Sequence, residues 1–174
     1  MSEDFLNVYE DHVVHVYGYF SFRALARADA EDLTQLTFEK ALRAWGSYQP
    51  ERASPRTWLL AIARNAYIDF RRREPRVRQL SISSGQIGEE ALPRLPGPEQ
   101  NLGLPPDLEA AVRRLGRRER EVLALRFGAD MRGPEIAELL KLSVANVQQL
   151  LSRALRRLRR DLETEASAAP PAGE

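Results

Sequence analysis

The sequence predicts an all-α protein with two small helical domains, an N-terminal helical bundle and a C-terminal helix-turn-helix domain, joined by a flexible linker. Apolar residues recur at helical spacing in both halves of the chain, and no alternating stretch is long enough to indicate a sheet. Between the halves lies a segment rich in proline and glycine, which disfavours a continuous helix. We therefore expect separately folded domains over 1–74 and 105–163, a linker over 75–104, and a frayed tail over 164–174.

Composition narrows the function classes. A chain of 174 residues that is 43% hydrophobic can bury one moderate core or two small ones. The net charge is only +1, so any affinity for nucleic acid must come from local basic clusters, such as Arg71–Arg73 and Arg153–Arg160. The absence of cysteine excludes disulfides and thiolate chemistry. No apolar run approaches the ~20 residues of a membrane span and the N-terminus is acidic, so we expect a cytoplasmic protein without membrane insertion.

Three helices are expected in the N-terminal domain. Apolar residues from Phe5 to Tyr17 repeat at helical spacing and predict the first. Asp29 is a candidate N-cap for the second, which runs to Trp45 before a loop over 46–52. Ser54 followed by a proline predicts the start of the third. This helix should end at Glu74, because the next residue is proline.

The third helix has two faces. On a helical wheel its apolar residues, Trp58 and Leu59 among them, occupy one arc, and a second arc carries Arg64, Asn65, Arg71 and Arg72. A basic, hydrogen-bonding face of this kind can lie along a nucleic-acid backbone. The alternative is a surface helix with ordinary solubilising charges. Aromatic residues here can stack on unpaired bases, but at helical spacing they are more often core residues, and we favour the core for Trp58.

Residues 133–160 predict two short helices around a tight turn. Pro134 suits the first helical position, and Ser143 is a good N-cap for the second helix. The turn also contains Lys141, which would cost up to ~1 kcal/mol if its φ is positive. The expected buried arc of the second helix comprises Val144, Val147, Leu151, Ala154, Leu155 and Leu158.

The opposite arc of this second helix predicts contact with DNA. In a helix-turn-helix the leading residues of the second helix meet base edges, and arginines further along neutralise phosphates. Asn146 and Gln149 are the candidate base readers, because amides can pair with adenine through two hydrogen bonds. The outward face comprises Ala145, Asn146, Gln149, Ser152, Arg153, Arg156, Arg157 and Arg160. The alternative is an amphipathic hairpin whose arginines are only solvated.

Together these stretches resemble a bacterial RNA polymerase sigma factor of the extracytoplasmic-function (ECF) group, which belongs to the sigma-70 family. The run AEDLTQLTFEKAL (30–42) looks like the segment that grips the polymerase, and SPRTWLLAIARNAYIDFRRR (54–73) looks like the segment that recognises and opens the minus-ten element. REREVLALRF (118–127) with the following helix-turn-helix looks like the module that reads the minus-thirty-five element. The resemblance implies promoter-specific transcription initiation with core RNA polymerase on double-stranded and melted promoter DNA.

The resemblance also implies roles for individual residues. The implied polymerase-binding residues are Asp32, Leu33, Gln35 and Phe38. The implied minus-ten residues are Tyr48, Arg64, Asn65, Asp69, Arg71 and Arg72, with the 46–53 loop holding a flipped-out base. The implied minus-thirty-five residues are Ser143, Ala145, Asn146, Gln148, Gln149, Ser152, Arg153, Arg156 and Arg157. The sequence Gln148, Gln149, Leu150 departs from the family, where a basic residue, a small residue and an arginine are usual. The linker would thread near the polymerase cleft.

Two other classes of function are weighed against this one. A stand-alone helix-turn-helix regulator would bind duplex DNA unaided, whereas a small sigma factor needs the polymerase. An enzyme has little support, since no phosphate-binding loop or nucleophile signature is present, and we predict no catalytic residue and no cofactor. His12 and His15 lie one turn apart, but no carboxylate completes a ligand set with suitable spacing, so no metal is expected. Anti-sigma partners are common in the group, although nothing in the sequence identifies one.

Overall fold

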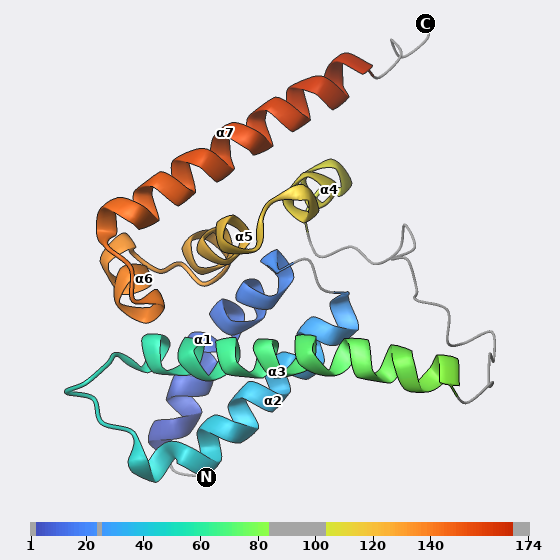
Figure 1. The fold of residues 1–174 in the computed structure, drawn as a ribbon. Coiled ribbons are helices and arrows are strands. Elements are labelled where there is room, and N and C mark those ends of the chain that lie inside the picture. Colours follow the sequence, from blue (N-terminus) through green and yellow to red (C-terminus); the bar gives the residue numbers. More distant parts are fainter. Residues whose placement is uncertain (1–2, 24–25, 84–103, 169–174) are drawn as a thin grey trace, which may run out of the picture.

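The computed structural model describes residues 3–23, 26–83 and 104–168, and every regular element in these ranges is helical (Figure 1). The predicted fold class is therefore confirmed. The N-terminal domain contains α1 (Glu3–Phe22), α2 (Arg27–Ala44), the short 3-10 helix η1 (Trp45–Ser47) and α3 (Pro55–Ser83). The three long helices pack on one another, and their largest fully buried side chains are Tyr19, Phe20, Leu59 and Leu60.

The C-terminal domain contains α4 (Pro106–Arg114), α5 (Arg117–Leu123), the π-helical turn η3 (Ala124–Gly128), α6 (Gly133–Leu140) and α7 (Val144–Ala168). The long α7 runs beside α4, α5 and α6 and contacts all three (Figure 1). A small core at its far end contains Val112, Leu115, Leu123, Ala154 and Leu158. The amphipathic α7 is thus stabilised by packing along most of its length.

Two helix boundaries differ from the predictions. Helix α2 begins at Arg27 with Ala26 as its N-cap, so Asp29 lies in its first turn instead of capping it. A carboxylate there still meets the positive end of the helix dipole. Helix α3 continues to Ser83, past Pro75, where it was expected to end at Glu74. Proline removes one backbone hydrogen bond, and good helix formers such as arginine and glutamine on both sides allow the helix to go on.

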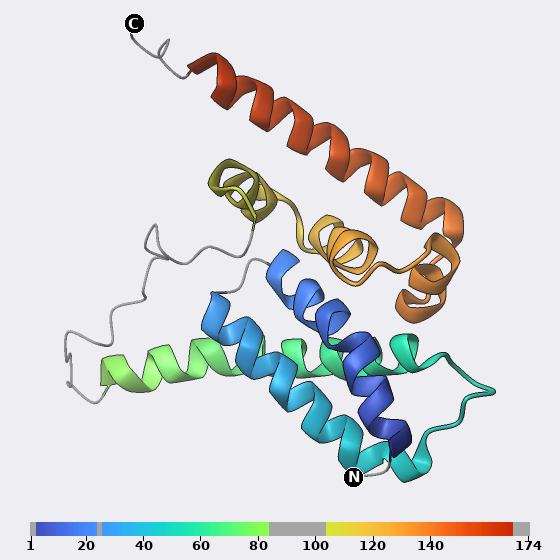
Figure 2. The ribbon, with the colours of Figure 1, turned by 180° about the vertical axis from the view of Figure 1, so that it is seen from behind.

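The two domains pack against each other in this structure and share a core. One cluster of buried side chains runs from the N-terminal helices into α5, η3, α6 and α7, with Val122, Leu125 and Met131 as members. Helix α5 supplies both cores, since Leu123 belongs to the small core of the C-terminal domain. The apolar residues of α5 are thus buried between the two domains, while Arg117 and Arg118 of the same helix are exposed. The two views of Figures 1 and 2 show α5 lying against α1.

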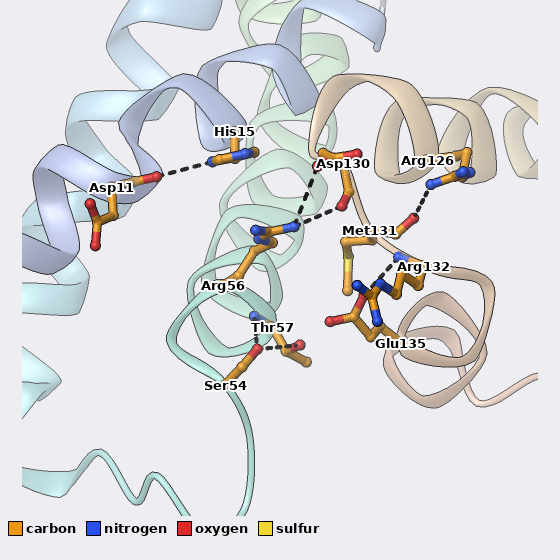
Figure 3. A network of polar contacts seen from close by, with 10 residues as sticks. All are labelled: Asp11, His15, Ser54, Arg56, Thr57, Arg126, Asp130, Met131, Arg132 and Glu135. Carbon is orange, nitrogen blue, oxygen red and sulfur yellow. Dashed lines mark hydrogen bonds and ion pairs between the residues drawn. The ribbon is translucent and has the colours of Figure 1, made fainter.

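Glycines allow the closest approach between the domains. A Cβ atom built on Gly18 of α1 would overlap the carbonyl group of Gly128 in η3, and a Cβ on Gly128 would overlap the backbone of Gly18. Only glycine lets two backbones come this near. Polar contacts add to the packing: the Arg56 Nη1 donates to the carbonyl oxygen of Asp130 at 2.7 Å (Figure 3).

Candidate nucleic-acid and polymerase interfaces

Helix α3 presents its predicted polar face outward. Ser54 caps the helix, because its Oγ accepts the backbone N–H of Thr57 at 3.2 Å (Figure 3). The opposite face is buried in the core. The predicted minus-ten residues that the structure exposes on this helix are Asn65, Asp69, Arg71 and Arg72, and the neighbouring Arg73 is exposed as well. These four predicted minus-ten residues therefore share one accessible surface.

Arg64 differs from the other predicted minus-ten residues. It is half-buried, and its Nε donates to Oε1 of Glu121 in α5 at 2.8 Å. Because Glu121 belongs to the other domain, the arginine is engaged across the domain interface. While this ion pair is formed, the Nε–H of Arg64 is not available to another acceptor.

An aromatic cluster holds the loop between α2 and α3. Tyr48 stacks on Trp45 at a centroid distance of 5.1 Å and lies 4.9 Å from Trp58. Its hydroxyl donates to the carbonyl oxygen of Ala53 at 2.9 Å. Trp58 is half-buried and packs against the core, as we favoured. Tyr48 is thus committed to shaping the 46–53 loop, a role that residue type alone did not indicate.

The predicted polymerase-binding residues of α2 divide into two pairs. Asp32 and Gln35 are exposed, whereas Leu33 and Phe38 are only 4% and 5% exposed. The structure therefore does not bring Leu33 and Phe38 to the surface as expected. They follow the helical repeat that faces the core, where Phe38 meets the ring of Tyr9 edge-on at 4.7 Å.

An apolar groove between α1 and α2 was not predicted. It has a volume of about 740 Å³, and Leu6, Tyr9, Val14 and Leu42 are exposed in it beside Gln35. Val14 is 72% exposed, which is unusual for a large apolar side chain in a packed helix. Exposed apolar surface of this extent marks an interaction site. A search for helical residues that do not fit the core arc could have found it.

Helix α7 forms a second groove on its predicted DNA-binding face. The backbone N–H of Asn146 donates to Ser143 Oγ at 3.1 Å, which confirms the predicted cap. Lys141, just before, adopts φ 54°, the strained conformation considered from the sequence. The groove has a volume of about 580 Å³ and is lined by Ala145, Gln148, Gln149, Ser152, Arg153 and Arg156. Asn146 is half-buried and does not line it.

The buried arc of α7 needs correction. Val144 and Leu155, both expected inside, are 40% and 45% exposed, while Leu150 is buried. The helix presents Val147, Leu150 and Leu158 to its neighbours, because α6, α5 and α4 contact it in turn along its length. The buried face of α7 is thus rotated by part of a turn from the predicted arc. A helical wheel drawn for one helix cannot show this rotation, because it does not include the neighbouring helices.

Arg157 is turned toward the protein. Its Nη1 donates to Oε2 of Glu119 at 2.8 Å, and the Glu119 side chain is only 7% exposed. The same carboxylate accepts the backbone N–H of Gly116 at 3.1 Å and so caps α5. Arg157 therefore joins α7 to the start of α5.

The two histidines of α1 lie close together, with ring centroids 5.8 Å apart. His15 Nδ1 lies 3.1 Å from the carbonyl oxygen of Asp11 (Figure 3). Burial, and then the nearby Arg56 and His15, lower the pKa of His12. Within the described ranges, no group of three His, Asp or Glu side chains gathers as metal ligands would.

Comparison with known proteins identifies the family. The chain matches Sigma-70 region 2 over residues 8–77 and Sigma-70 region 4 over residues 107–158. It is 31% identical to the RNA polymerase sigma factor CnrH of Cupriavidus metallidurans over 82% of this chain and 78% of that protein. It is 28% identical to the ECF sigma factor SigM of Bacillus subtilis, over 87% of this chain and 91% of SigM.

A solved structure of CnrH in complex with the cytosolic domain of CnrY superposes with a TM-score of 0.64 at 25% identity, covering 92% of this chain and 88% of that one. The fold with its two sigma-70 regions defines a transcription initiation factor. The chain belongs to the ECF sigma factors of RNA polymerase, which direct promoter-specific transcription, and this excludes the stand-alone regulator. None of the described helices is long and apolar enough to cross a bilayer.

Proposed function

We propose that this sigma factor performs no chemistry itself and works in the cytoplasm through three binding surfaces. Helix α2 binds the polymerase, α3 binds the minus-ten element, and α7 binds the minus-thirty-five element. The observation that carries the proposal is that α3 and α7 each expose a basic, hydrogen-bonding face opposite their packed one. We propose 1–74 and 105–163 as the functional units and 75–104 as the connection between them.

The polymerase surface comprises Asp32 and Gln35 together with the apolar groove between α1 and α2. A groove with exposed leucine and valine side chains and acidic residues at its edge, Glu31 and Glu39, suits an amphipathic helix that carries basic residues. Leu33 acts indirectly, since it packs beneath this surface, and the largely buried Phe38 forms part of the groove lining.

The minus-ten surface comprises Asn65, Asp69, Arg71 and Arg72, which Arg64 joins once it leaves Glu121. Extrusion of a base costs on the order of a few kcal/mol. A surface that binds the unpaired state more tightly shifts the equilibrium toward melting. Tyr48 and its aromatic neighbours hold the 46–53 loop in the shape that receives the base.

The minus-thirty-five surface is the groove on α7. Gln148 and Gln149 line it and can reach base edges, and Arg153 and Arg156 lie one turn further on for phosphates. Ala145 lines the groove near the start of the helix, and Ser143 lies just before it. Asn146 and Arg157 have smaller parts, because Asn146 is half-buried and Arg157 is bound to Glu119.

Regulation by an anti-sigma factor is also proposed. CnrH, the relative with 31% identity, was solved in complex with the cytosolic domain of CnrY. The apolar groove between α1 and α2 offers this chain a surface for such a partner.

Transcription in vitro with core polymerase on genomic fragments tests the proposal. The purified chain should direct initiation to a defined set of promoters. Replacing Arg64 and Arg71 together by alanine should reduce open-complex formation, followed by permanganate reactivity of unpaired thymines, more than it reduces polymerase binding. Equal loss of both would count against the role of α3.

A further inference from the structure

A cavity of about 600 Å³ lies where the end of α1, the outer part of α3 and the start of α5 meet. Its polar lining contains six arginines and a single carboxylate: Arg23, Arg64, Arg71, Arg72, Arg117, Arg118 and Glu121. The carboxylate already accepts a hydrogen bond from Arg64 at 2.8 Å. The lining therefore holds much more positive charge than its own acid can balance.

Arg23 is the most buried of these arginines, at 5% exposure. Its guanidinium lies 4.2 Å above the ring of Tyr67, and its Nη1 donates to the carbonyl oxygen of Arg117 at 3.4 Å. The Nε–H is buried and has no hydrogen-bond partner among the described residues. A buried donor without an acceptor costs free energy unless a ligand satisfies it.

Cations crowd the region beyond the lining itself. Burial lowers the pKa of Arg120, Tyr67 opposes this shift, and the positive charges of Arg23 and Arg71 add to it. An anion in the cavity would relieve this repulsion.

We propose that this cavity binds a small oligophosphate anion, the chemistry shared by inorganic triphosphate and nucleoside triphosphates. Guanidinium groups hold phosphate oxygens through paired hydrogen bonds, and several guanidiniums in one pocket suit a ligand with several negative charges. The volume falls in the range of about 300–1,000 Å³ typical of small-molecule sites.

The bound anion would join the two domains, because its arginines come from α1, α3 and α5. Its effect on promoters rests on the proposed function: Arg64, Arg71 and Arg72 belong to the minus-ten surface, so the anion and DNA would compete for them. The binding itself does not depend on that assignment.

Calorimetric titration of the full chain with inorganic triphosphate at constant ionic strength tests the site. Arg117 and Arg118 are exposed, lie on α5 and have no part in the proposed polymerase or DNA surfaces. The double variant R117Q/R118Q should lose about tenfold or more in affinity, equivalent to about 1.4 kcal/mol. The matched variant R159Q/R160Q removes two exposed arginines of α7 outside the cavity and should change affinity by less than about twofold.

Further titrants separate the sources of the anion. Equal affinity for triphosphate and ATP would support recognition of the phosphate chain alone, and tighter binding of ATP would support a nucleotide ligand. A triphosphate-dependent rise in Tm that R117Q/R118Q abolishes would support the site as well.

The proposal is overturned if triphosphate does not saturate the chain at one equivalent, or if both double variants lose affinity equally. It is also overturned if only a single-stranded oligonucleotide binds with this dependence on Arg117 and Arg118. Transcription by R117Q/R118Q without added triphosphate should equal that of the unaltered chain, and this measurement separates failure of the cavity from failure of the proposed function.

Discussion

Arg156 and Arg157 are adjacent on α7 but lie in different surroundings. The first is exposed in the groove, and the second holds the buried carboxylate of Glu119. One of these two arginines is therefore available to a ligand, and the other stabilises the fold. The sequence alone shows two equivalent arginines.

Replacement of Arg157 by alanine should destabilise the fold by about 1–3 kcal/mol, because it leaves a buried carboxylate without its cation. Urea unfolding followed by circular dichroism measures this. The matched variant R156A should unfold within about 0.5 kcal/mol of the unaltered chain. Equal stabilities of R156A and R157A would contradict the structural role of Arg157.

His12 should make stability depend on pH. Its pKa is lowered in the folded state, mainly by burial and then by Arg56, so the unfolded chain binds a proton more readily. Stability from this group is complete above the ordinary value of 6.5 and is lost as the pH falls below that value. Unfolding at about pH 7.5 and about pH 5 measures the loss.

The variant H12Q should show a smaller loss of stability between these two pH values than the unaltered chain. H15Q should keep most of the loss, since it leaves His12 in place and removes only the smaller contribution of His15 to the lowered pKa of His12. An unchanged slope in H12Q would assign the effect to other groups.

At the scale of single elements, we expect different residues of α7 to determine the preferred DNA sequence and the overall affinity for DNA. Replacing Gln148 and Gln149 by alanine should change the preferred minus-thirty-five sequence, because these amides line the groove. Replacing Arg153 and Arg156 should weaken binding on all sequences and reduce the dependence of log K on log salt. Selection of promoters from a randomised library by holoenzyme measures both. Unchanged preference in the glutamine variant would remove these residues as readers.

Elements were predicted well where one face is apolar and a cap is present. The starts of α3 and α7 follow from Ser54 and Ser143, whose hydroxyls accept the expected N–H groups. Pattern alone could not place Leu155 or Leu150, because both lie near the border of the arc and tertiary contacts decide which is covered. The pattern of α2 also could not show that Leu33 and Phe38, which we predicted as polymerase contacts, are core residues.

At the scale of the whole molecule, the packing of the two domains was not predictable. The apolar residues of α5 and η3 could have served their own domain, and nothing in the pattern shows that Val122 and Leu125 face the other one. Gly18 and Gly128 are in contact although they lie far apart in the sequence. The identity of a residue as glycine does not indicate which segment it will contact.

Gly128→Ala should loosen this packing, because the added methyl group would overlap the backbone of Gly18. Overpacking typically costs about 1–3 kcal/mol. Energy transfer between dyes on the two domains should fall, and the thermal midpoint should drop. Gly133→Ala is the control, since a Cβ there meets nothing within 4 Å. Unaltered energy transfer in Gly128→Ala would show that the interface tolerates the methyl group.

Glu121→Gln should raise the affinity of the isolated chain for promoter DNA, since it frees Arg64 from a contact worth about 1 kcal/mol. A fluorescence anisotropy titration measures the change. Glu138→Gln removes an exposed acid from the same domain and serves as the control for net charge. Equal gains in the two variants would mean that charge alone is responsible.

The ion pair between Arg64 and Glu121 also has a consequence for how the chain behaves among the many DNA sites of a chromosome. When the domains are packed together, Arg64 is already paired with Glu121. The measured affinity for DNA is therefore the intrinsic affinity multiplied by the fraction of molecules in which this pair is open. A sigma factor that is not bound to polymerase therefore binds non-promoter DNA less tightly. Arg64 becomes available when a binding event, such as association with RNA polymerase, supplies enough free energy to separate the two domains.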